Sequence, residues 1–78
     1  MGKYCYDVVA SICSETYRTD SHLVCGGFNT KEEAIDYTNK NGISEVDYYS
    51  HCNDNETAYI EIEEHDENGN ITDVVMVD

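Results

Sequence analysis

The second half of this chain contains no lysine and no arginine. Positions 41–78 hold eleven aspartate and glutamate residues, whereas all four basic residues lie within the first forty positions, and the 78-residue chain has a net charge of −13. An acidic surface keeps a small protein in solution, but such surfaces usually intersperse both signs of charge. Carboxylates without counter-charges repel one another until positive charge arrives. The charge distribution therefore predicts a basic protein partner.

Long apolar segments are also missing. A membrane helix needs roughly 20 consecutive apolar residues, and the longest apolar run here is the four residues 74–77. The first six residues lack the apolar region of a secretory signal peptide. We therefore expect a soluble, cytoplasmic protein without membrane contact.

Motifs for catalysis and metal binding are absent from the sequence. It has no G-x-S-x-G, no phosphate-binding loop and no H-E-x-x-H, and none of its four cysteines forms a Cys-x-x-Cys pair. We expect no enzyme activity, no cofactor and no metal. A zinc-dependent or thiol-dependent module is the alternative, and its candidate ligands are His22, His51, Cys52 and His65.

The first part of the chain predicts a β-hairpin. Apolar and polar residues alternate over 4–13, which is typical of a strand with one buried face. A polar break at 18–20 precedes a shorter strand at 21–25, which we expect Gly26-Gly27 to end. This loop would place Cys13 opposite Cys25. We expect Cys5, Cys13, Cys25 and Cys52 to be free thiols, with Cys13 and Cys25 the one pair able to oxidise in air.

A helix is predicted over residues 31–40. Thr30 and Glu33 match a capping box, in which each side chain accepts a hydrogen bond from the backbone N–H of the other residue. Asn41-Gly42 supplies the left-handed stop. About three helical turns are too short to be stable alone, so the helix must pack on the sheet.

Three more strands complete the expected fold. They lie at 43–50, 58–63 and 71–77, and Asn68-Gly69 is a hairpin signal between the last two. The predicted order is β-β-α-β-β-β. We therefore expect one α+β domain over residues 1–78, with an antiparallel sheet and one helix packed on one face.

The acidic strands suggest where a partner binds. Side chains two apart on a strand share a face at about 6.7 Å, so Glu61 and Glu63 should form a regular anionic row beside Tyr59. Basic proteins that grip the regularly spaced phosphates of DNA could also bind such a row. Nearby acids should extend the field, and tyrosines should act as anchors. The predicted partner-binding residues are Glu45, Asp47, Tyr48, Tyr49, Glu56, Tyr59, Glu61, Glu63, Glu64, Asp66, Glu67 and Asp73.

In size, acidity and α+β pattern, the chain resembles the small inhibitors of phages and mobile elements, including anti-CRISPR and anti-restriction proteins that mimic nucleic acid. The resemblance implies a non-enzymatic protein that does not bind nucleic acid itself. It would occlude the basic, nucleic-acid-binding surface of a CRISPR effector or another nuclease. A structural or assembly subunit that forms a homo-oligomer, such as a homodimer, is a further alternative.

Overall fold

Four antiparallel strands form one open sheet in the order β2-β1-β3-β4. The computed structural model describes residues 4–77. Its elements are β1 (Cys5–Cys13), β2 (Arg18–Phe28), α1 (Lys31–Lys40), the 3-10 helix η1 (Glu45–His51), β3 (Thr57–His65) and β4 (Ile71–Met76). The predicted α+β class, with an antiparallel sheet and one α-helix packed on one face, is confirmed.

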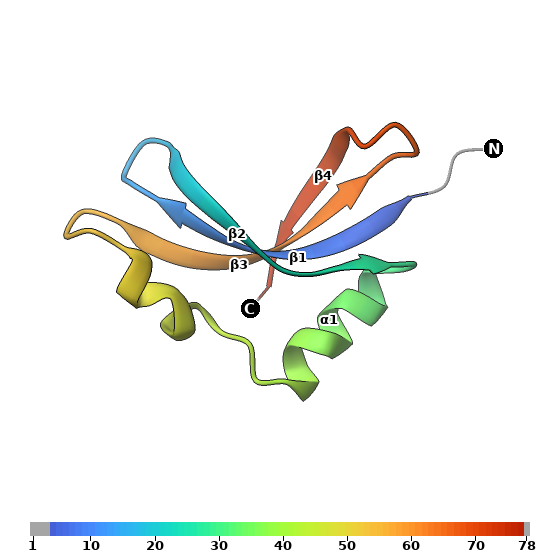
Figure 1. Ribbon diagram of the computed structural model, residues 1–78, viewed down its shortest axis with the longest axis horizontal. Coiled ribbons are helices and arrows are strands. Elements are labelled where there is room, and N and C mark those ends of the chain that lie inside the picture. The colour runs from blue at the N-terminus through green and yellow to red at the C-terminus, as the bar shows by residue number, and fades with distance from the viewer. Residues whose placement is uncertain (1–3, 78) are drawn as a thin grey trace.

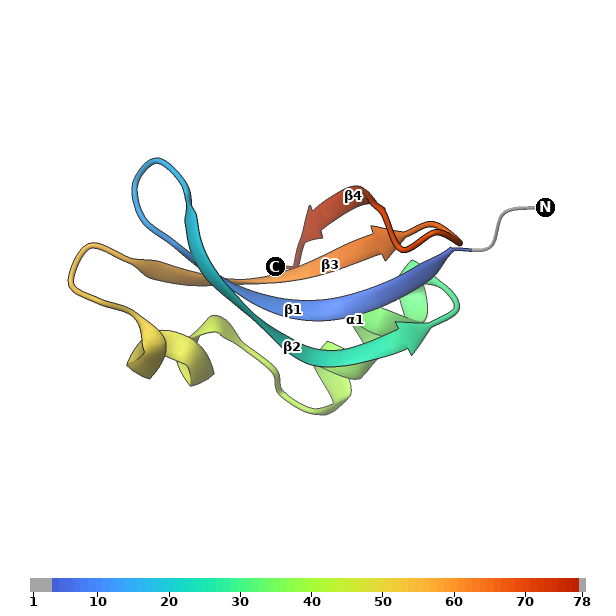
Figure 2. The same ribbon diagram turned by 45° about the horizontal axis from the view of Figure 1, so that its top comes forward.

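The core lies between one face of the sheet and α1. Val8 and Ala10 of β1 and Ile60 and Ile62 of β3 are buried against Ala34 of α1. The alternation of strand residues explains this arrangement, because every second side chain points to the same face. Both helices lie on this side of a strongly bent sheet (Figure 1). Seen after a 45° turn, the edge strands β2 and β4 flank the central pair (Figure 2).

The predicted start and stop of α1 and the predicted hairpin between β3 and β4 are present in the structure. The hydroxyl of Thr30 accepts a hydrogen bond from the backbone N–H of Glu33 at 3.1 Å, which caps α1. The return bond from Thr30 N–H to the Glu33 carboxylate does not form. After the helix, Gly42 has a φ of +61°, the left-handed stop predicted there. Gly69, with a φ of +84°, closes the predicted hairpin between β3 and β4.

The predicted end of the second strand is wrong. β2 begins at Arg18 and continues through Gly26-Gly27 to Phe28. Gly27 has a φ of +83°, and the pairing with β1 shifts register near this point, between Tyr6 and Val8. The two glycines thus form an irregularity inside the strand rather than its end.

The expected neighbourhood of Cys13 and Cys25 is also wrong. The first turn lies at Ser14–Tyr17, closed by a 2.9 Å hydrogen bond from Ser14 N–H to Tyr17 C=O, and not at 18–20. Moving the turn by four residues places Cys13 opposite Arg18 and Cys25 opposite Val8. All four cysteines are free thiols, as predicted.

The expected strand at 43–50 is instead the 3-10 helix η1. The Asp47 carboxylate accepts from Ser44 N–H at 3.2 Å, and Asp47 N–H donates to Ser44 C=O at 3.1 Å. These two bonds turn the backbone at the position where a strand would need it extended. A Ser-x-x-acid start signal therefore outweighs the strand preference of Val46, Tyr48 and Tyr49.

Neither helix of the described residues is long and apolar enough to cross a membrane.

Gly26 of β2 lies close to the Asp7 side chain, and a substitution at Gly26 tests this contact. A Cβ added at Gly26 would lie 2.5 Å from Asp7 Oδ1, and its three nearest atoms all belong to the Asp7 side chain. The same Asp7 oxygen accepts from Gly27 N–H at 3.0 Å. We expect Gly26→Ala to lower the free energy of unfolding by about 1–3 kcal/mol, because the carboxylate must move.

The matched test is a double-mutant cycle read by urea denaturation. In an Asp7→Ala background the added methyl group meets no carboxylate, so Gly26→Ala should cost much less there. Equal costs in the two backgrounds would show that Asp7 is not the obstacle.

Candidate protein-binding face

The face of the sheet opposite α1 and η1 carries no helix, and we call it the open face. In antiparallel strands, residues directly opposite one another point to the same face. One row across all four strands consists of Leu23, Val9, Glu61 and Met76. The neighbouring row consists of Asp7, Glu63 and Val74. Carboxylates therefore occupy the centre of the open face, with apolar side chains toward the sheet edges.

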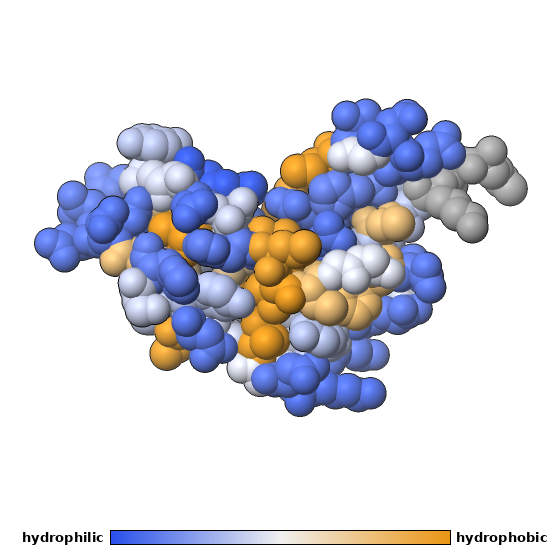
Figure 3. Space-filling view, in the orientation of Figure 1, coloured by the Kyte–Doolittle hydropathy of each residue, from blue (hydrophilic) through white to orange (hydrophobic). Residues whose placement is uncertain are grey.

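The open face is hollowed. The sheet bends into a V (Figure 1), and the space-filling view shows a notch between two lobes of the surface (Figure 3). Val9 and Ser11 are buried although no helix covers them. Glu63 is only 7% exposed. The floor of the notch is thus well shielded from water, which strengthens electrostatic interactions there.

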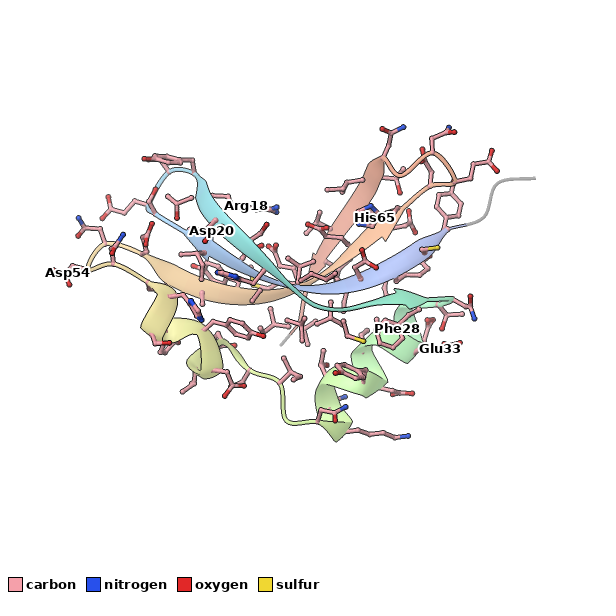
Figure 4. All side chains as sticks on the ribbon, viewed as in Figure 1. Arg18, Asp20, Phe28, Glu33, Asp54 and His65 are labelled. Carbon is pink, nitrogen blue, oxygen red and sulfur yellow. The ribbon has the colours of Figure 1, made fainter. Side chains whose placement is uncertain are left out.

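Arg18 bridges the two central carboxylates. Its Nη2 lies 3.4 Å from Glu61 Oε1, and its Nη1 lies 3.5 Å from Glu63 Oε2. Arg18 and His65 enter the V from its opposite arms (Figure 4). A cation from the first half of the chain therefore partly neutralises two carboxylates of the acidic second half.

Other side chains also orient these carboxylates. The Ser11 hydroxyl donates to Glu61 Oε1. His65 Nε2 lies 3.2 Å from Glu63 Oε1 and 3.3 Å from Asp7 Oδ2. Each central carboxylate thus has one partner besides Arg18, so its position does not depend on the arginine alone.

The predicted anionic row is present but is not free. Tyr59, Glu61 and Glu63 do share the open face, as the strand pattern predicts. The expectation that their carboxylates lack intramolecular counter-charges is wrong, since Arg18 contacts both. The sequence separation between Arg18 and Glu61 explains the error, because no local pattern brings them together.

The structure does not gather the other predicted residues on the open face. Glu45, Asp47, Tyr48 and Tyr49 belong to η1, on the opposite side of the sheet. Tyr49 is 48% exposed. Tyr48 packs against the core. Of these two tyrosines, Tyr49 is the one free to act as an anchor.

The remaining predicted acids lie toward the ends and edge of the sheet. Hydrogen bonds from Thr72 and Tyr6 hold the pKa of the Glu64 carboxyl below its ordinary value. Asp73 of β4 lies 3.9 Å from Lys31 Nζ. Asp66 and Glu67 belong to the turn between β3 and β4. The predicted set is therefore spread over both sides of the molecule.

A second hollow lies beside the open face. Its volume is about 370 Å³, and it forms where the β1–β2 turn approaches the segment that leads into β3. Its lining consists of Cys13, Ser14, Glu15, Asp54, Asn55, Glu56, Thr57 and Tyr59. Glu56 accepts hydrogen bonds from Thr19 and from Asn53 N–H, which lower its pKa. Three carboxylates and an aromatic ring are the groups that accommodate a Lys or Arg side chain.

Sequence reasoning missed several residues of this surface. Glu15 and Asp54 lie in polar turns that offer no periodic signal. Asp7 and Ser11 belong to the polar positions of the first strand, so strand alternation alone could have placed them beside Glu63 and Glu61.

The geometry does not favour the zinc or thiol alternative. Within residues 4–77 no group of three or more His, Cys, Asp or Glu side chains can hold a metal ion. The His22 and His51 rings do meet, with centroids 4.7 Å apart. Burial raises the pKa of the Cys52 thiol, which reduces the thiolate fraction that metal binding and nucleophilic chemistry require.

Comparison with protein family models, curated proteins and solved structures finds no match for this chain.

The turn beside the open face gives a prediction about pH. Backbone N–H groups of Asn70 and Asn68 donate to Asp66 Oδ1 at 3.0 and 2.9 Å and lower the pKa of its carboxyl. A carboxyl with a lowered folded pKa stabilises the fold above its unfolded pKa, about 3.9 for aspartate. This contribution is lost as the pH falls through the folded value.

We expect Asp66→Asn to be less stable than the unmodified chain at pH 7, because the amide accepts the same bonds without a charge. The difference should narrow as the pH falls below about 4, as measured by thermal unfolding across pH. Glu67→Gln is the matched control, since it removes one charge from the same turn. A pH-independent difference for Asp66→Asn, or an equal effect of Glu67→Gln, would contradict this assignment.

Proposed function

We propose that the chain is a non-enzymatic binding protein that occupies a basic, nucleic-acid-binding surface of another protein. The supporting observation is the distribution of ion pairs. Arg18 and Lys31 face acids of their own chain, whereas many exposed carboxylates have no cation within 4 Å among the described residues. These are Glu15, Glu32, Glu33, Asp36, Glu45, Asp47, Asp54 and Glu67.

Long-range attraction follows from this surplus of negative charge. A field of one sign steers an oppositely charged partner and raises the association rate. Since salt screens such a field, affinity should fall as ionic strength rises. A surface that binds phosphates through Lys and Arg presents the charges that these carboxylates would meet.

The hollow lined by Glu15, Asp54, Glu56 and Tyr59 offers a place for a basic side chain. It adjoins the open face along β3, where Tyr59 precedes Glu61 at the next position on the same side. A basic partner could therefore contact the hollow and the notch together. The partner we favour is a CRISPR effector or another nuclease in the cytoplasm of a bacterial host, as the compositional resemblance implies.

The test measures, by fluorescence anisotropy, whether the chain displaces labelled duplex DNA from a panel of CRISPR effector complexes and other nucleases. The chain should release the DNA from the nuclease that it binds, and the released fraction should fall as salt is added. Glu15→Gln combined with Asp54→Asn should reduce potency about two- to ten-fold, because two exposed charge pairs are lost.

Glu32→Gln combined with Asp36→Asn is the matched control. It removes the same charge from the exposed side of α1 and should change potency less than the hollow variant does. If DNA stays bound throughout the panel, the proposed function is wrong. If both variants lose potency equally, net charge alone acts and the hollow has no special part.

A further inference from the structure

Apolar side chains border the charged centre of the open face. Leu23 on β2 is 68% exposed and Met76 on β4 is 54% exposed, and they lie at the two ends of the row that contains Glu61. Val74 is also exposed in the next row, opposite Glu63. Exposed apolar surface combined with polar residues is typical of protein interaction sites, where a polar rim usually surrounds an apolar patch; on the open face the apolar side chains border a polar centre instead.

The carboxylate pair already accommodates a guanidinium group. Each terminal nitrogen of Arg18 approaches a different carboxylate, one from Glu61 and one from Glu63. Ser11 and His65 contact the same carboxylates from within β1 and β3, so the receptor is built without Arg18. A planar guanidinium offers several fixed donors, whereas lysine offers a single nitrogen.

The hold on Arg18 itself is loose. Its contacts of 3.4 and 3.5 Å exceed the 2.7–2.9 Å typical of a strong charge-assisted hydrogen bond. The side chain is 40% exposed. Arg18 is also the first residue of an edge strand, directly after the Ser14–Tyr17 turn. A better-placed guanidinium can therefore replace it with little change to the sheet.

We propose that the open face binds an arginine side chain of the protein partner, flanked by apolar residues, and that this arginine displaces Arg18. The inference rests on the proposed function and names the chemistry that the face recognises. Charge complementarity selects the occupant, since the anionic floor favours a cation and the apolar border favours aliphatic neighbours. A second copy of this chain is disfavoured, because each copy has a net charge of −13.

The test uses two capped tripeptides, acetyl-Leu-Arg-Leu-amide and acetyl-Leu-Lys-Leu-amide, titrated into the full chain and followed by NMR. The arginine peptide should bind more tightly than the lysine peptide. Binding should shift the amide signals of Glu61 and Glu63. It should also move the Arg18 side-chain Nε–H signal toward the position of a solvated arginine.

Three variants sharpen this test. Arg18→Gln should bind the arginine peptide about two- to five-fold more tightly, since an internal competitor worth a weak ion pair is removed. Lys31→Gln, which makes the same charge change on the other side of the sheet, should have a smaller effect. Leu23→Ser should weaken binding of both peptides, because it removes part of the apolar border.

The outcomes separate this inference from the proposed function. Three results would each show that the peptide arginine does not displace Arg18. They are equal affinity for the two peptides, an Arg18 signal that stays in place, and weaker binding by a folded Arg18→Gln variant. DNA displacement could still succeed in that case, and the proposed function would stand without it. If Arg18→Gln does not fold, the Arg18 signal of the unmodified chain decides the question.

Discussion

The register of β1 against β3 is the constraint on which the rest of the structure depends. Val8 pairs with Ile62 and Val9 pairs with Glu61, so apolar pairs face α1 while the acidic positions face the notch. Side chains alternate with a period of two, and a slip by one residue would exchange these faces. Glu61 and Glu63 would then enter the core, and Ile60 and Ile62 would lose it. The same pairing thus defines both the core and the open face.

This register places carboxylates where water is scarce, and their desolvation must be offset. Glu63 retains little exposure, and a buried charge without partners costs several kcal/mol. Arg18, His65 and Ser11 supply the compensation, but only Arg18 does so from an edge strand. The contacts of Ser11 with Glu61 and of His65 with Glu63 lie within β1 and β3, so they do not depend on the edge strand. The arginine is the member that can leave while the two central strands stay paired.

Local patterns accounted for the elements with one dominant signal. Alternation located β1 and β3, the Thr30 hydroxyl located the start of α1, and Asn68-Gly69 located the last hairpin. Prediction was wrong at residues 43–50, where the aromatic and β-branched composition of a strand competes with a Ser-x-x-Asp turn signal. Short-range hydrogen bonds determined the outcome there.

The candidate site was harder to predict than the fold. Strand periodicity placed Tyr59, Glu61 and Glu63 on one face, but it could not show that Arg18 neutralises two of them. That contact depends on the exact turn of the first hairpin, which sequence reasoning placed four residues too late. The wrong position of this one turn therefore gave Cys13 the wrong cross-strand partner, and it left the ion pairs of Arg18 with Glu61 and Glu63 unpredicted.

The surplus of acid also bears on the open edges of the sheet. An edge strand exposes unpaired backbone groups that can pair with another copy. Val77 N–H donates to Ile60 C=O of β3. The N–H groups of successive residues in a strand point to opposite sides, so Val74 N–H points away from β3. The Asp73 carboxylate accepts from that N–H at 3.0 Å. An acid of β4 thus occupies a donor that a second strand would need, while the net charge keeps other copies at a distance. The acidity that we propose as the attraction for a basic partner therefore also protects the edge against self-pairing.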